Sequence, residues 1–185
     1  MISAAQSDRI DWEAALVQRA RNGDMRAFER LYREHIGRIY GLCLRLTRDP
    51  AAAEDCAQET FINAWRGLKN FETRSAFGTW LHRIAVNVAL ARRRRPAWTV
   101  EPLPDAEEPE EPEWTLDTPV EVSEIEAAVG ALPDGARDVL VLCGIYGYSH
   151  GEASEMLGVA EGTCKAQLHR ARALLRRKLY PEGSP

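Results

Sequence analysis

The chain has 185 residues, of which 45% are hydrophobic and 28% charged, and its formal net charge is −4. These values are ordinary for one or two small globular domains. No run of 18 apolar residues exists, and the N-terminus lacks a basic start followed by an apolar core. The sequence therefore predicts neither a membrane span nor a signal peptide, and we expect a cytoplasmic protein without membrane insertion.

The charge is distributed very unevenly along the chain. Residues 1–95 carry a net charge of +6, residues 96–136 one of −12, and residues 137–185 one of +2. Two basic ends around an acidic middle indicate contact with nucleic acid. The four cysteines and four histidines show no spacing typical of a metal site. We therefore expect reduced thiols packed on helix faces, with no metal and no cofactor.

Helical periodicity predicts an all-α domain at residues 11–95, with short connections between its helices. A short helix over 11–22 is capped by Asp11, and Asp24 caps the next helix. Asp49 caps a third helix, with Pro50 at the first helical position. A fourth helix starts near Phe77 and ends before Pro96.

Residues 96–120 form an acidic, proline-rich linker in this interpretation. Six of the ten prolines lie between 96 and 119, and such a composition cannot bury enough apolar surface to fold alone. Trp98, Trp114 and Leu116 are the large apolar residues in this polar segment. They could dock at a specific site or pack loosely onto either domain, and the sequence favours neither.

A second helical domain is predicted at residues 121–180. Asp134 caps a helix that runs through Cys143, and Ser149 with Glu152 forms a capping box before a short helix that ends at Gly158. A basic helix with a buried stripe led by Cys164 follows from 161. A short helix, a turn and a longer basic helix are typical of the helix-turn-helix, whose second helix enters the major groove of DNA.

The basic helix offers side chains suited to bases and to phosphates. The stripe predicts that residues at its start point outward to base edges: Thr163, Lys165, Ala166, Gln167, His169 and Arg170. Arg172, Arg176, Arg177 and Lys178 lie further along and suit phosphates. A solvated basic helix in an ordinary bundle is the alternative, and the preceding turn favours the helix-turn-helix.

The first domain combines aromatic and basic side chains in "FETRSAFGTWLHRIAVNVALARRRR". Exposed aromatics can stack on unpaired bases while arginines follow the backbone. Phe71 and His82 are predicted to be exposed, whereas Phe77 and Ile84 are assigned to the core. The arginine run that includes Arg92 and Arg93 also complements a helix dipole.

Four motifs together resemble the extracytoplasmic-function sigma factors of the sigma-70 family. "GDMRAFERLYREH", "AEDCAQETFINAWRGLKNF" and "SAFGTWLHRIAVN" are similar to sigma region 2. "GTCKAQLHRARALLRRKL", with the preceding "ALPDGARDVLVL" and "GYSHGEASEMLGV", is similar to region 4. The resemblance covers nearly all of 12–95 and 121–179. It implies a transcription initiation factor that binds core RNA polymerase through its clamp coiled coil and flap, recognises promoter DNA and is restrained by an anti-sigma factor.

The resemblance also implies roles for single residues. Asp55, Gln58 and Glu59 would dock on the clamp coiled coil, although acidic residues at a helix start are also favoured by the helix dipole. The residues that would hold the melted −10 strand are Phe71, Ser75, Trp80, His82, Asn87, Arg92 and Arg93. Lys165, Ala166, Gln167 and Arg170 fall where the family reads the −35 element. The family commonly has Val, Ser and Arg where this chain has Cys164, Ala166 and Gln167, which leaves the preferred −35 sequence open.

Two other functional classes are alternatives to this interpretation. A stand-alone helix-turn-helix regulator with an effector-binding first domain would bind duplex DNA as a dimer without polymerase. An enzyme finds no support, because the sequence shows no nucleophile–base pair, phosphate loop or metal cluster.

Overall fold

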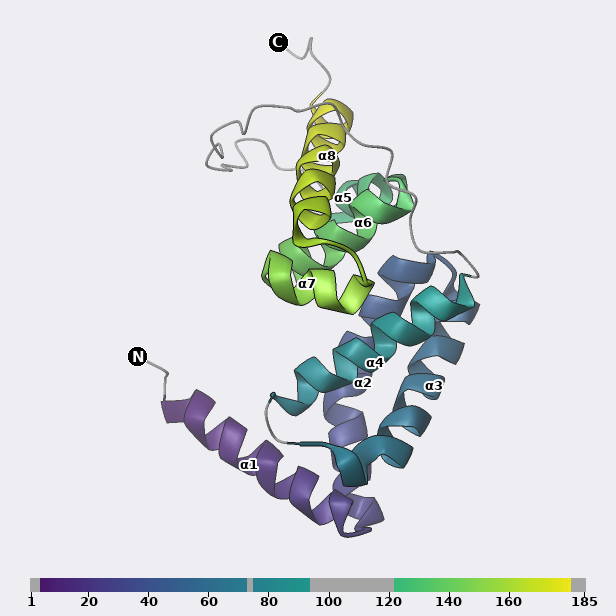
Figure 1. Ribbon diagram of the computed structural model, residues 1–185. Helices are drawn as coiled ribbons and strands as arrows, with labels where there is room; N and C mark the ends of the chain where they lie inside the picture. Colours follow the sequence, from purple (N-terminus) through teal and green to yellow (C-terminus); the bar gives the residue numbers. More distant parts are fainter. Residues whose placement is uncertain (1–3, 73–74, 94–121, 181–185) are drawn as a thin grey trace. The chain divides into compact units, whose positions relative to one another are not determined.

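The computed structural model describes residues 4–72, 75–93 and 122–180, which form helices and turns without a strand (Figure 1). The chain divides into two compact units, Met1–Arg94 and Arg95–Pro185. The predicted all-α fold with two helical regions is therefore confirmed. Residues 94–121, which include the whole predicted linker with Trp98, Trp114 and Leu116, lie outside the described residues.

The first unit contains α1 (Ala4–Arg21), α2 (Met25–Thr47), α3 (Pro50–Gly67), the 3₁₀ turn η1 (Leu68–Asn70) and α4 (Phe77–Arg92). α2 packs against α1, α3 and α4, so it is the central helix of this unit. Its buried side chains include Leu31, Ile39, Leu42 and Leu46, which recur at helical spacing. The apolar stripe seen in the sequence is thus the core-facing side of α2.

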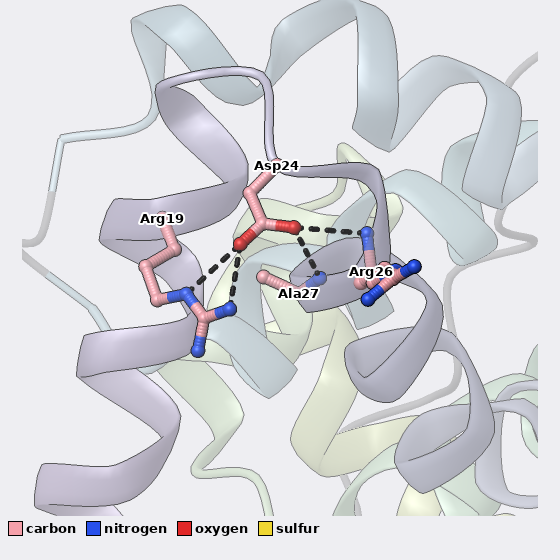
Figure 2. Close-up of polar contacts among 4 residues, drawn as sticks. All are labelled: Arg19, Asp24, Arg26 and Ala27. Carbon is pink, nitrogen blue, oxygen red and sulfur yellow. Dashed lines mark hydrogen bonds and ion pairs between the residues drawn. The ribbon is translucent and has the colours of Figure 1, made fainter.

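Asp24 sets the start of α2, as predicted. Its carboxylate accepts hydrogen bonds from the backbone N–H groups of Arg26 at 3.0 Å and Ala27 at 3.1 Å (Figure 2). The other carboxylate oxygen accepts from the Arg19 guanidinium at 2.7 and 2.9 Å. Hydrogen bonds from Arg19 and from the backbone, the first being the largest cause, lower the pKa of Asp24. Gly23 adopts φ of +93°, a conformation that glycine tolerates best.

The α2–α3 connection also follows its sequence signals. Arg48 ends α2 in a left-handed conformation with φ of 62°, and its N–H donates to Leu44 O. Asp49 then caps α3 by accepting from Ala51 N at 2.9 Å and Ala52 N at 3.1 Å, with Pro50 in the first turn. The connection is short, and α2 and α3 pack against each other.

α1 differs from the prediction, because it begins at Ala4 rather than after Asp11. No glycine or proline lies between 4 and 11, and Ala and Gln are good helix formers, so nothing in this stretch ends the helix. Asp11 is therefore an internal helical residue rather than a cap.

The second unit contains α5 (Val122–Gly130), α6 (Asp134–Val139), the π-helical turn η2 (Leu140–Ile145), α7 (His150–Leu157) and α8 (Glu161–Leu179). Asp134 does not cap α6, because Pro133 occupies the cap position. Asp134 instead accepts from Arg137 Nη2 at 3.0 Å. The helix predicted through Cys143 continues from α6 as the wider η2 turn.

The core of the second unit forms where α8 crosses the earlier helices. Leu132, Ala136 and Ala171 are buried together, and Leu140, Leu174 and Leu175 pack around them. The Arg137 side chain is also buried, and it donates to the Leu132 carbonyl at 3.3 Å. This core fixes α8 on the remainder of the unit.

Candidate nucleic-acid and protein interfaces

α7 and α8 form the predicted helix-turn-helix and pack against each other (Figure 1). The Ser149 hydroxyl accepts from Glu152 N at 3.2 Å, and the Glu152 carboxylate accepts from Ser149 N at 2.9 Å. This reciprocal capping box satisfies two N–H groups at the start of α7. Gly158 ends α7 with φ of +67°, so the chain turns sharply into α8.

Most of the residues predicted to face DNA on α8 are accessible. Lys165, His169, Arg170 and Arg176 are exposed, and Thr163, Ala166 and Arg172 are partly exposed. Gln167 was predicted to point outward, and that orientation is wrong, because only 8% of the residue is exposed. It lies three residues after Cys164 and four before Ala171, which places it on the buried side of the helix.

The accessible side of α8 has three small residues and one histidine at its centre and cations at its edges. Successive helical residues are rotated by about 100°, so this side is centred on Gly162, Ala166, His169 and Ala173. Lys165 and Arg176 flank it on one edge, and Arg170 and Arg177 flank it on the other. A helix with little side-chain bulk between two rows of cations suits a groove bordered by phosphates.

Glu161 is an acidic residue at the start of this basic surface that the sequence analysis did not single out. Its carboxylate lies 3.4 Å from Lys165 Nζ, and both side chains are exposed. The i, i+4 spacing from Glu to Lys is visible in the sequence and was the available signal. The Lys165 ammonium group therefore pairs with the Glu161 carboxylate on the same helix when no other anion is present.

Cys164 packs inward, as predicted for the leading residue of the stripe. The residue is fully buried. Burial, with smaller contributions from Cys143 and Glu161, raises the pKa of its thiol to about 11. The thiol is therefore protonated at neutral pH, which disfavours nucleophilic reactivity.

In the first unit, three aromatic rings gather where η1 leads into α4. The ring centroid of Phe71 lies 4.8 Å from that of Trp80 and 6.0 Å from that of Phe77, and Phe77 lies 5.7 Å from Trp80. Phe71 was predicted to be exposed; this is wrong, since only 4% of it is accessible. Its loop position gave no information on the two aromatic neighbours that cover it. Phe77 lies in the core, as predicted.

His82 was also predicted to be exposed and is buried, with 5% of the residue accessible. Position 82 lies next to the main apolar stripe of α4, and the neighbouring helices cover that flank as well. Burial lowers the pKa of His82 to about 4, and the nearby charges of Arg38 and His35 lower it further. The imidazole is therefore neutral in the folded protein at physiological pH.

The other residues predicted for the melted strand differ in accessibility. Ser75, Asn87 and Arg92 are exposed, whereas Trp80 and Arg93 are partly exposed. These side chains reach the surface, whereas Phe71 and His82 do not.

The residues predicted to dock on polymerase lie on one exposed side of α3. Asp55, Gln58 and Glu59 are exposed, and Ile62, one turn further along, is 50% exposed. An exposed isoleucine among acidic side chains suits a partner with both basic and apolar groups. This acidic side of α3, Asp55 to Ile62, is called the α3 face below.

Asp55 on the α3 face forms an ion pair with Arg92 at the end of α4. The pair joins a residue predicted to bind protein to one predicted to bind DNA. Both side chains are about half exposed, so the pair is screened by solvent and worth at most about 1 kcal/mol. A competing partner can therefore separate the two charges at low cost.

Two further properties of the surface concern metals and membranes. Among residues 4–72, 75–93 and 122–180, no group of three or more His, Cys, Asp or Glu side chains is placed to hold a metal ion. None of the helices in these ranges is long and apolar enough to cross a membrane.

Two family models match separate parts of the chain. Residues 31–99 match the family model of Sigma-70 region 2, and residues 123–175 match that of Sigma-70, region 4. RNA polymerase sigma-H factor of Pseudomonas aeruginosa is 37% identical over 179 residues, which are 90% of this chain and 93% of that protein. ECF RNA polymerase sigma factor SigM of Mycobacterium tuberculosis is 37% identical over 158 residues, covering 85% of this chain and 79% of SigM.

A solved structure shares the fold. The structure of CnrH in complex with the cytosolic domain of CnrY aligns with a TM-score of 0.64 and 26% sequence identity. The alignment covers 93% of this chain and 99% of the matched one.

Proposed function

The chain belongs to the extracytoplasmic-function sigma factors of the sigma-70 family, and on this premise we propose how its two units divide the work of initiation. The first unit binds core RNA polymerase and the −10 element, and the second reads the −35 element. One observation carries this proposal: a region 2 match is followed along the chain by a region 4 match. The region 4 match includes α7 and most of α8, which form the helix-turn-helix. The protein performs no catalysis of its own and acts in the cytoplasm.

At the −35 element, α8 is the recognition helix. Lys165 and Arg170 reach guanine edges, since lysine and arginine donate to guanine O6 and N7. Ala166 and His169 lie at the centre of the accessible side, and the partly exposed Thr163 lies near the helix start. Arg172, Arg176 and Arg177 bind phosphates further along. Gln167 is not assigned a base contact, because it is buried.

At the −10 element, the exposed polar residues of α4 and the loop before it contact the strand. Ser75 and Asn87 supply hydrogen bonds, Trp80 a stacking surface, and Arg92 and Arg93 phosphate contacts. Phe71 and His82 support this surface from below, because both are buried. The packed aromatic cluster holds Trp80 in place, so that unpaired bases can stack on it.

Core polymerase docks on the α3 face. Asp55 and Glu59 attract a basic helix, and Ile62 adds an apolar contact. Because Asp55 is paired with Arg92, a basic partner that takes Asp55 frees Arg92 for phosphate. Docking and DNA contact would then favour each other, as linkage requires.

The linker at 96–120 must let the two units reach both promoter elements. About 25 residues span up to roughly 80–90 Å when extended, whereas elements two helical turns apart lie roughly 70 Å apart. A stretched linker is therefore needed, and its prolines and like charges favour extension.

A second protein that covers these surfaces would restrain the factor. CnrH, which aligns over 93% of this chain, was solved with the cytosolic domain of CnrY bound. We expect a comparable anti-sigma partner here, and the exposed Ile62 beside the acidic side chains of the α3 face is an available contact for it.

Reconstitution with purified core polymerase tests the function. The protein should bind core enzyme, and the holoenzyme should start transcripts at a common pair of sequence elements when genomic fragments are used as templates. If the protein binds no core enzyme but binds duplex DNA tightly as a dimer, it is a stand-alone regulator and the proposal fails.

Charge reversal on α3 tests the docking face. Asp55→Lys and Glu59→Lys should each weaken core binding by at least fivefold, because they repel a basic partner. Glu54→Lys, on the same helix about 90° from the centre of the face, is the matched control and should change binding by less than twofold. Arg92→Gln removes the Asp55–Arg92 ion pair but leaves the acidic side chains of the α3 face in place. It therefore separates the effect of the ion pair on core binding from the effect of the α3 face. Equal effects of Glu54→Lys and Glu59→Lys would contradict the assigned face.

A further inference from the structure

We propose that α1 is a positioning element of the −10 site: it holds both ends of the segment that joins η1 to α4. The inference rests on the proposed function of the first unit. The region 2 match begins at residue 31, so α1 lies outside it. Two polar contacts and one buried stripe connect α1 to the elements that border the aromatic cluster.

The first contact secures the start of α4. His35 Nε2 lies 2.7 Å from the Glu13 carboxylate, and because an ionised carboxylate only accepts, the imidazole donates this hydrogen bond. The His35 ring meets the Phe77 ring edge-on at a centroid distance of 5.4 Å. A Cβ on Gly78 would lie 3.4 Å from His35 Cε1, so the ring directly underlies the first turn of α4. Glu13 therefore fixes the ring on which α4 begins.

The second contact secures the other end of the segment. Arg21 Nη2 donates to the Lys69 carbonyl at 3.4 Å, which is a long hydrogen bond. Lys69 lies in η1, and the backbone N–H of Phe71 closes that turn by donating to Leu68 O at 3.1 Å. The last turn of α1 is thereby tied to the turn from which Phe71 emerges. This contact is weaker than the first, since it is longer and exposed.

α1 itself is anchored, so its contacts can transmit position. Leu16, Val17 and Ala20 are buried, and α1 packs on α2, η1 and α4. The Arg30 guanidinium of α2 lies 5.2 Å from the Trp12 ring centre, which favours a cation–π contact. Apolar packing provides the attachment, and the two polar contacts determine where the neighbouring elements begin.

Next to the two anchored ends lie Phe71, Phe77 and Trp80, the cluster that supports the proposed strand contacts. Lys69 precedes Phe71 by two residues, and His35 touches Phe77 directly. A shift of either end moves the rings and the partly exposed Trp80 with them. α1 thus acts on DNA through these residues and needs no contact with DNA itself.

Promoter melting by the reconstituted holoenzyme tests this inference. The probe is a fluorescent adenine analogue placed in the −10 element of a promoter that the wild-type holoenzyme melts, with core affinity measured in parallel. Glu13→Ala should reduce melting roughly three- to tenfold and leave core affinity unchanged, because the hydrogen bond that positions the His35 ring is lost. Glu13→Gln keeps an oxygen acceptor for His35 and should restore most of the melting.

Arg21 and Arg19 form a matched pair on the same helix. Arg21→Ala should reduce melting about twofold, since its hydrogen bond is long. Arg19→Ala removes an ion pair to Asp24 that does not reach η1 or α4, and it should leave melting unchanged.

Either of two results would overturn the inference. One is wild-type melting by Glu13→Ala; the other is equal loss by Arg19→Ala and Glu13→Ala, which would indicate general destabilisation. Failure of the wild-type protein to bind core polymerase would instead refute the proposed function, so the two outcomes are distinguishable.

Discussion

Protonation of His82 should destabilise the first unit as the pH falls. The folded protein holds the pKa of His82 at about 4, mainly through burial, whereas an unfolded chain has a value near 6.5. Between these values the unfolded chain binds a proton at His82 and the folded chain does not. The stabilisation is therefore present in full above pH 6.5 and is lost as the pH falls toward 4.

The magnitude follows from the two pKa values. One pKa unit corresponds to about 1.4 kcal/mol, so the difference between 6.5 and about 4 amounts to about 3 kcal/mol over the whole window. At pH 5 about 2 kcal/mol of this should already be lost. Such a loss is a substantial part of the stability of a small domain.

Urea unfolding of the full chain, followed by tryptophan fluorescence, measures this effect. Three of the five tryptophans, Trp12, Trp65 and Trp80, lie in the first unit, residues 122–180 contain none, and Trp98 and Trp114 lie outside the described residues. The His82→Gln variant cannot gain the charge, so the difference in unfolding free energy between wild type and variant isolates this histidine. That difference should fall by about 2 kcal/mol from pH 7.5 to pH 5. A difference that stays constant over this range would refute the reasoning, as would an NMR titration of His82 near pH 6.5.

Three further predictions concern packing and thiol chemistry. Leu42→Ala in α2 should cost about 2–5 kcal/mol in urea unfolding because Leu42 is fully buried, whereas Met25→Ala at an exposed position should change stability by less than about 0.5 kcal/mol. Gln167→Met should stabilise the second unit by up to about 1 kcal/mol in thermal unfolding, because no donor among the described residues reaches the buried Gln167 Oε1; a clear loss of stability would reveal a hidden partner. Cys43 and Cys164, with pKa values raised to about 12 and about 11, should resist a thiol reagent at pH 8 until urea unfolds the chain, and rapid labelling of the folded protein would contradict their burial.

The sequence by itself determined the helices, most of their ends and the family. Helix caps involve residues within three or four positions of one another. The caps at Asp24, Asp49 and the Ser149–Glu152 pair, and the turn at Gly158, could therefore be predicted from the sequence. Helical periodicity likewise identified the core side of α2 and the inward position of Cys164. These signals are local, and each depends only on neighbours along the chain.

Only the tertiary structure decided which residues at the edges of those stripes are covered. Phe71, His82 and Gln167 lie beside or between apolar positions, and their burial depends on helices that pack from elsewhere in the sequence. The contacts of α1 are of the same kind, because Glu13 meets His35 across 22 positions and Arg21 meets Lys69 across 48. The apolar periodicity of a helix identifies which side is buried but not how far around the helix the burial extends. Whether a side chain at the edge of that side is buried is therefore decided by the packing of other helices.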